Sequence, residues 1–123
     1  MTEDEELIQK IRNFCEERDW RKFHNPKDLA IALSIESSEL LELFLWKNPD
    51  ETASICKTKS SQIEEEIADI AIYLLDLVDV LNIDLKKAIQ HKLEKNRLKY
   101  PVELSKGKNL KYDELNRPPH SDS

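Results

Sequence analysis

The stretch from Asn25 to Lys47 reads as one long helix, and it constrains the whole fold because it carries carboxylates on an apolar face. Asn25 can cap this helix, and Pro26 suits its first turn, where the missing N–H of proline is not needed. At about 100° per residue, Glu36 falls within the arc of apolar side chains and Glu39 lies at the edge of that arc. A carboxylate on a buried stripe costs free energy unless a partner compensates it. The rest of the chain must therefore supply a partner for both acids.

A second acidic pair intrudes on the apolar surface of a later helix, expected over residues 62–81. Glu66 falls among the apolar residues of this helix, and Asp69 follows at i+3 on the same face. The segment 48–60 is expected to be a polar loop that could be partly helical. It is short enough to let the two helices pack antiparallel. Two facing pairs would then bring four carboxylates around one small volume.

Four ionised carboxylates in one volume repel one another strongly, and divalent cations would relieve that repulsion. Mg²⁺ prefers oxygen ligands and is commonly shared with substrate phosphates, so it is the cation we expect. The histidines do not have metal-ligand spacing, and the Glu-x-x-His motif of di-iron bundles is absent. The alternative is a solvated helix face, which is the more frequent meaning of a single E-x-x-E motif. Three other acids lie on polar flanks and are expected to face solvent: Glu42, Glu65 and Asp76.

The apolar periodicity predicts an all-α protein with main helices over residues 2–18, 25–47, 62–81 and 84–100. We expect these helices to form a four-helix bundle in a core domain, 1–100, followed by a partly extended or disordered C-terminal tail, 101–123. The helix over 62–81 is apolar around most of its circumference, and a small bundle cannot bury such a helix on all sides. The sequence therefore predicts a homo-oligomer joined through this helix. Side-chain caps are expected at Thr2 with Glu5, Asn25, Ser61 with Glu64, and Asp84.

Composition and charge argue against several classes of protein. No apolar run approaches the ~18 residues of a membrane span, so no membrane partner is expected. The acidic N-terminus does not resemble a signal peptide, and the two cysteines lack framework spacing, which favours a cytoplasmic protein with reduced thiols. The net charge is −6, yet residues 86–111 are strongly basic, which suits either an anionic ligand or a solvated charged face. No basic recognition helix is present, so duplex nucleic acid is not an expected partner.

Further residues could complete a nucleotide site around the acids. Lys92 and Asn96 lie near the apolar edge of one helix face, and lysine suits phosphate oxygens. Trp20 and Trp46 flank the acidic helix and could stack on a base. Tyr73 lies one turn beyond the second acidic pair, where its hydroxyl could reach a ligand. The alternatives are an ordinary solvated face for the lysines of this helix, core packing for the tryptophans, and a hydrogen bond from Tyr73 to a carboxylate.

The chain from about residue 16 to about residue 115 resembles the MazG-like, all-α nucleoside triphosphate pyrophosphohydrolases, most closely the dCTP pyrophosphatase branch. The resemblance is carried by ERDWRKFHNPKDLAIALSIESSELLELFLWK, EEEIADIAIYLLDLVDVLNIDL and KLEKNRLKYPVELSKGKNLKYDEL. An E-x-x-E followed by E-x-x-D is a weak signal by itself. The flanking DW, FH-x-P, F-x-W-K, IYL and NR-x-KYP elements make it specific.

The resemblance implies Mg²⁺-dependent hydrolysis of a (deoxy)nucleoside triphosphate, dCTP or a modified dCTP, to the monophosphate and pyrophosphate. It also implies a homodimer or homotetramer with sites at subunit boundaries. The metal ligands of the family would fall on Glu36, Glu39, Glu66 and Asp69, with Glu36 or Glu39 as the catalytic base. Its substrate-binding residues would fall on Trp20, Trp46, Tyr73, Lys92 and Asn96.

The chain departs from the family pattern at three positions. Ser38 replaces the usual glycine of E-x-G-E-L, Leu45 replaces a glutamine, and Ile11 replaces a histidine frequent in the dCTP branch. These changes leave the metal site intact but leave the base preference open. The alternatives are a related dUTP-type or phosphoribosyl-ATP pyrophosphohydrolase, or a non-catalytic helical scaffold that binds nucleotide.

Overall fold

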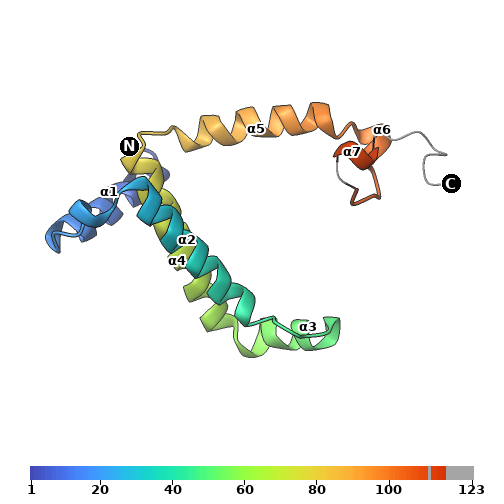
Figure 1. Ribbon diagram of the computed structural model, residues 1–123, viewed down its shortest axis with the longest axis horizontal. Coiled ribbons are helices and arrows are strands. Elements are labelled where there is room, and N and C mark those ends of the chain that lie inside the picture. The colour runs from blue at the N-terminus through green and yellow to red at the C-terminus, as the bar shows by residue number, and fades with distance from the viewer. Residues whose placement is uncertain (111, 116–123) are drawn as a thin grey trace. The chain divides into compact units, whose positions relative to one another are not determined.

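The computed structural model describes residues 1–110 and 112–115, and every regular element within these ranges is a helix (Figure 1). The predicted all-α class is therefore confirmed. Contacts divide the chain into two units, Met1–Ile83 and a second unit that begins at Asp84. The elements of the first unit are α1 (Glu3–Glu17), η1 (Arg21–Phe23), α2 (Pro26–Glu42), α3 (Pro49–Thr58) and α4 (Ser60–Val80).

Three of the expected helix caps are present. The hydroxyl of Thr2 accepts from the Glu5 N–H at 3.2 Å, and the carboxylate of Glu5 accepts from the Thr2 N–H at 2.9 Å. Asn25 Oδ1 accepts from the N–H of Asp28 at 2.9 Å, and Asp84 Oδ1 accepts from the N–H of Lys87 at 3.1 Å. These side chains satisfy N–H groups that have no partner within their own helix.

The segment 48–60 is mostly helical, in contrast to the predicted loop. Asn48 Oδ1 accepts from the N–H of Glu51 at 2.8 Å, and Pro49 occupies the first helical position. The preceding helix, which is predicted to extend to Lys47, ends at Glu42. Helix α4 then begins at Ser60 without a side-chain cap, so the predicted capping box at Ser61 is wrong.

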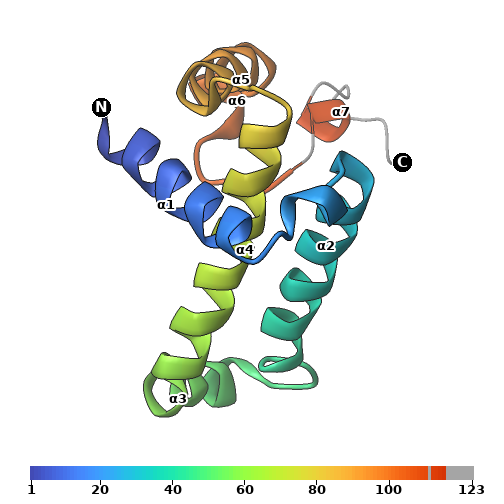
Figure 2. The ribbon, with the colours of Figure 1, turned by 90° about the vertical axis from the view of Figure 1, so that its left-hand side faces the viewer.

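Helices α2 and α4 run antiparallel and form the centre of the first unit, as Figure 2 shows. Helices α1 and α3 both pack on α4. Four apolar side chains are buried in this unit: Cys15, Leu29, Ile55 and Val78. The antiparallel arrangement places the second half of α2 beside the first half of α4, which is where the two acidic pairs lie.

The apolar surface of α4 is only partly covered in the single chain. Ile67 is 52% exposed, and three more large apolar residues on α4 or at its C-cap are also exposed: Ile72, Leu74 and Leu81. A second copy of the chain, as the sequence predicts, could therefore pack on apolar residues of α4 that the first unit leaves exposed. Within the described part of the chain, no helix is both long enough and apolar enough to cross a membrane.

The second unit contains α5 (Leu85–Lys99), α6 (Val102–Ser105) and α7 (Tyr112–Leu115). Helix α5 ends at Lys99, before Pro101, as the sequence predicts. The two short helices occupy part of the expected tail. The predicted tail also includes residue 111 and residues 116–123, which lie outside the described residues.

Candidate active site

Three of the four predicted metal ligands meet between α2 and α4. Glu36 and Glu39 come from the second half of α2, and Glu66 comes from the first half of α4. One carboxylate oxygen from each of these residues lies within 4.8 Å of the others. Asp69 lies outside this group of three, but its charge acts on both Glu36 and Glu66. We call these four residues the acidic cluster.

The surroundings of the acidic cluster disfavour negative charge. The pKa of Glu36 is raised to about 7, first by burial and then by hydrogen bonding with Glu39 and by the charges of the other acids. Burial is also the largest cause that raises the pKa of Glu66, and the charge of Glu39 is the next. Both shifts follow from placing several carboxyl groups in a partly desolvated volume.

Within the first unit, Met1–Ile83, no salt bridge involves the acidic cluster. The salt bridges there involve other acids, and the buried Oε2 atoms of Glu36 and Glu66 have no hydrogen-bond partner. Buried carboxylate oxygens normally have a partner, so these two oxygens remain available to bind a ligand. A divalent cation with a preference for oxygen ligands fits this set of donors.

Tyr73 lies beside the acidic cluster on α4. Burial raises the pKa of its hydroxyl, and the charges of Glu36 and Asp69 add to the effect. The hydroxyl therefore stays protonated at neutral pH and can donate a hydrogen bond. This position is consistent with the predicted role of Tyr73 at the site.

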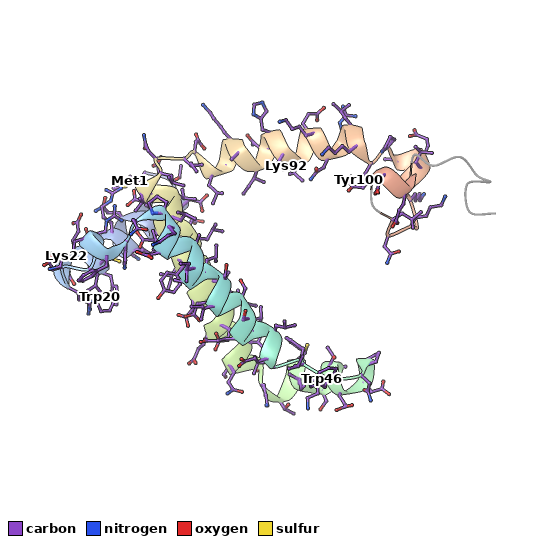
Figure 3. All side chains as sticks on the ribbon, viewed as in Figure 1. Met1, Trp20, Lys22, Trp46, Lys92 and Tyr100 are labelled. Carbon is purple, nitrogen blue, oxygen red and sulfur yellow. The ribbon has the colours of Figure 1, made fainter. Side chains whose placement is uncertain are left out.

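The two tryptophans lie at opposite ends of α2, as Figure 3 shows. The 17 residues of α2 span about 25 Å at the helical rise of about 1.5 Å per residue. One chain therefore cannot place Trp20 and Trp46 against the same base. The sequence predicts a pocket walled by both residues, and the single chain does not bring them together.

The backbone around each tryptophan is unusual. Trp46 follows α2 in a left-handed conformation, with φ of 64°, and its side chain is 92% exposed. Asp19, which precedes Trp20, has φ of 56°. A bulky side chain at positive φ is rare and costs free energy. The end of α2 thus holds the Trp46 ring out from the surface of its own unit.

Lys92 and Asn96 lie one helical turn apart on α5, in the second unit. Lys92 is exposed and Asn96 is half-buried. Their spacing places both side chains on one face of α5. Their contribution to the site stays a prediction.

Sequence reasoning missed a second polar cluster in the first unit. Asp76 is expected to face solvent, but it is only 2% exposed and contacts two residues of the segment before α2. Arg21 donates to Asp76 Oδ1 at 2.7 Å, and His24 Nδ1 lies 2.7 Å from Asp76 Oδ2. Asp76 is therefore on a polar side of α4, but residues of η1 and the segment after it cover that side. Position on an isolated helix cannot reveal such a cover.

The chain matches a known protein family over most of its length. The model of the MazG-like family matches residues 31–115, which include the whole acidic cluster. The chain belongs to the MazG-like family.

Curated relatives support this assignment over nearly the full chain. Rat dCTP pyrophosphatase 1 (Rattus norvegicus) is 38% identical to the MazG-like chain over 115 residues, which cover 92% of the chain and 68% of the relative. The human protein (Homo sapiens) of the same name is 36% identical over 113 residues, which cover 90% of the chain and 66% of the relative.

A solved structure has the same fold as the MazG-like chain. The crystal structure of a pyrophosphatase from Archaeoglobus fulgidus superposes with a TM-score of 0.79 at 45% sequence identity. The match covers 82% of this chain and 94% of the archaeal chain. The resemblance predicted from the sequence and the expected enzyme class, a pyrophosphohydrolase, are thereby confirmed.

Proposed function

We propose that this MazG-like enzyme hydrolyses dCTP, or a modified dCTP, to the nucleoside monophosphate and pyrophosphate with Mg²⁺ as its cofactor. The observation that carries the proposal is the acidic cluster, in which carboxylates converge and no salt bridge within the first unit neutralises them. The names of the curated relatives, dCTP pyrophosphatase 1, support the choice of substrate.

The residues that would hold the cation are Glu36, Glu39, Glu66 and Asp69. When bound, Mg²⁺ would neutralise charge on the phosphate oxygens and on the leaving pyrophosphate. The carboxylates themselves orient the attacking water, and Glu36 or Glu39 accepts its proton. Tyr73 donates a hydrogen bond at the edge of the cluster, and Lys92 and Asn96 bind phosphate oxygens.

A complete site requires a second copy of the chain in this proposal. Because α2, which is about 25 Å long, separates the two tryptophans in the chain, a base that contacts both must receive one of them from another subunit. Trp46 is exposed and held outward, as such a role requires. The open apolar residues of α4 supply surface for an interface. We therefore propose a homodimer or homotetramer, built from four-helix bundles, with sites at subunit boundaries.

The two cysteines, Cys15 and Cys56, are free thiols. Free thiols are typical of reducing compartments, and we therefore propose a cytoplasmic location.

Product analysis tests the proposed reaction. The protein is incubated with dCTP, 5-substituted dCTP, dUTP and dTTP, with Mg²⁺ or with EDTA, and the products are separated by ion-exchange chromatography. We expect dCMP and pyrophosphate in equal amounts, only when Mg²⁺ is present. Release of orthophosphate, or turnover that EDTA does not affect, would contradict the proposal. Full activity of Glu39→Gln would show that the acidic cluster is not the catalytic site.

A further inference from the structure

Asp76 occupies the most buried polar position in the described part of the first unit. Its side chain is 2% exposed, although it lies on α4 among half-buried apolar residues. A carboxylate at such a position is tolerated only with good partners, because desolvation costs several kcal/mol. Arg21 donates a hydrogen bond to Asp76 Oδ1 at 2.7 Å, and His24 Nδ1 lies 2.7 Å from Asp76 Oδ2 without the geometry of a hydrogen bond.

Both partners come from the short segment between α1 and α2. This segment runs from Trp20 to His24, and Asn25, the cap of α2, follows it directly. Asp76 thus connects α4 to the segment that carries Trp20 and to the start of the helix that carries Glu36.

Trp20 is fixed from its other side by the end of α1. The N–H of Trp20 donates to the carbonyl of Cys15 at 2.9 Å, and the N–H of Asp19 donates to the carbonyl of Glu16 at 3.0 Å. This pattern, with Asp19 at positive φ, is the Schellman motif of helix ends. The Trp20 ring packs edge-to-face on Phe14, with 5.7 Å between ring centroids. The tryptophan is held by α1 on one side and by the anchored segment on the other.

We propose that Asp76 is a positioning residue for the base pocket: through Arg21 and His24 it holds Trp20 in place, without binding substrate or cation itself. The proposal rests on the proposed function for the role of Trp20. The positioning effect on the tryptophan can be measured without turnover.

A cation bound at Asp76 is a less suitable explanation of the same cluster. Cys15, His24 and Asp76 offer ligand atoms within 4.8 Å of one another, which would suit a metal by distance alone. However, Arg21 already contacts both Asp76 and Asp79, and Arg12 contacts Asp79. Two guanidinium groups balance two carboxylates, so this cluster has no excess negative charge to attract a cation. The acidic cluster of Glu36 differs from it in that respect.

The first test measures Trp20 directly. In a Trp46→Phe background, Trp20 is the only tryptophan, and its emission maximum and quenching by acrylamide report its surroundings. We expect Asp76→Asn to shift the emission to longer wavelength and to raise the quenching constant twofold or more. The matched control is Glu65→Gln, which removes an exposed charge from the same helix. Unchanged emission and quenching in folded Asp76→Asn would overturn the proposal.

The second test separates positioning from a general loss of structure. With Trp46 intact, we expect Asp76→Asn to raise KM for dCTP at least threefold, with kcat within twofold and unchanged affinity for Mn²⁺. A parallel loss of Mn²⁺ affinity would overturn the proposal, because it would place Asp76 in the cation site. If Asp76→Asn does not fold, Arg21→Gln replaces it, since this side chain is 28% exposed. Arg21→Lys, which keeps the charge, should partly restore KM.

Failure of the proposed function has a different signature. If the unmodified protein hydrolyses none of the nucleotides, the proposed reaction is wrong, and the emission of Trp20 in Asp76→Asn still decides whether Asp76 positions it.

Discussion

Glu36 of α2 and Glu66 of α4 present carboxylate oxygens within 4.8 Å of each other, and each also has a buried oxygen without a hydrogen-bond partner. Two carboxyl groups at this distance cannot both ionise at low cost unless a cation is present. The antiparallel packing of α2 and α4 maintains this unfavourable arrangement. Such local instability is typical of a functional site rather than of a structural one.

Removal of single carboxylates should abolish turnover without unfolding the protein. We expect Glu36→Gln, Glu39→Gln and Glu66→Gln each to lower kcat/KM for dCTP by about 100-fold or more, as for other groups that stabilise transition-state charge. Steady-state kinetics with a pyrophosphate-coupled assay measures this effect. Glu65→Gln serves as the control and should retain wild-type activity. Amide variants that keep full activity would contradict the assignment.

The metal-free protein should lose stability as the pH rises from 5 to 8. The folded state holds the pKa of Glu36 at about 7, above the ordinary value of 4.5, so the folded protein binds the proton more strongly than the unfolded chain does. The stabilisation is complete below the ordinary pKa and is lost as the pH rises through about 7. Partial contact with solvent limits the expected change to about 1–2 kcal/mol in the free energy of unfolding.

Urea denaturation at several pH values, in EDTA, measures this dependence. Glu66 also contributes stability that is lost as the pH rises, because its pKa is raised as well. Asp79 acts in the opposite direction, since its pKa is lowered, but only at pH below about 4. Saturating Mg²⁺ or the variant Glu36→Gln should reduce the dependence. A metal-free protein that gains stability between pH 5 and 8 would be inconsistent with this account.

The left-handed backbone at Trp46 can be tested by two substitutions that differ only in a methyl group. Trp46→Gly and Trp46→Ala both remove the ring, and both should weaken nucleotide binding about tenfold if the ring stacks on a base. Because φ at this position is 64°, the glycine variant should be more stable than the alanine variant by about 1 kcal/mol. Chemical denaturation and nucleotide titration provide the two measurements. Equal stability of the two variants would mean that the backbone is not held at positive φ.

Arg12 and Asp79 should show strong energetic coupling. Arg12 binds both carboxylate oxygens of Asp79, and the Asp79 side chain is 11% exposed. A bidentate pair with one partly buried member should give a coupling energy of about 1–2 kcal/mol in a double-mutant cycle of Arg12→Ala and Asp79→Ala. Arg12→Lys should recover only part of it, because an ammonium group cannot donate two parallel hydrogen bonds. Strictly additive effects in urea denaturation would rule out this coupling.

Local signals predict much of this fold. The caps at Thr2, Asn25 and Asp84 follow from the chemistry of residues within one helical turn, and the structure contains all three. The acidic cluster could also be predicted, because Glu36 and Glu66 interrupt apolar stripes that any packing of the two helices must bring inside.

Features that depend on a second element could not be predicted in this way. The sequence places Asp76 on a polar flank of its helix, but only the fold shows that η1 covers that flank with Arg21. Asn48 and Pro49 can end one helix or begin the next, and here they begin α3. The separation of Trp20 and Trp46 depends on the length of α2. The presence of both residues in one family pattern therefore does not place them in one pocket of one chain.

Binding of Mn²⁺, a spectroscopic substitute for Mg²⁺, tests the central claim most directly. Electron paramagnetic resonance titration of the nucleotide-free protein gives the affinity and the number of ions without any need for turnover. We predict that Glu36→Gln and Glu66→Gln each weaken Mn²⁺ binding at least tenfold, whereas Glu65→Gln binds like the unmodified protein. Equal Mn²⁺ affinity in all four proteins would show that the carboxylates of α2 and α4 do not form one cation site.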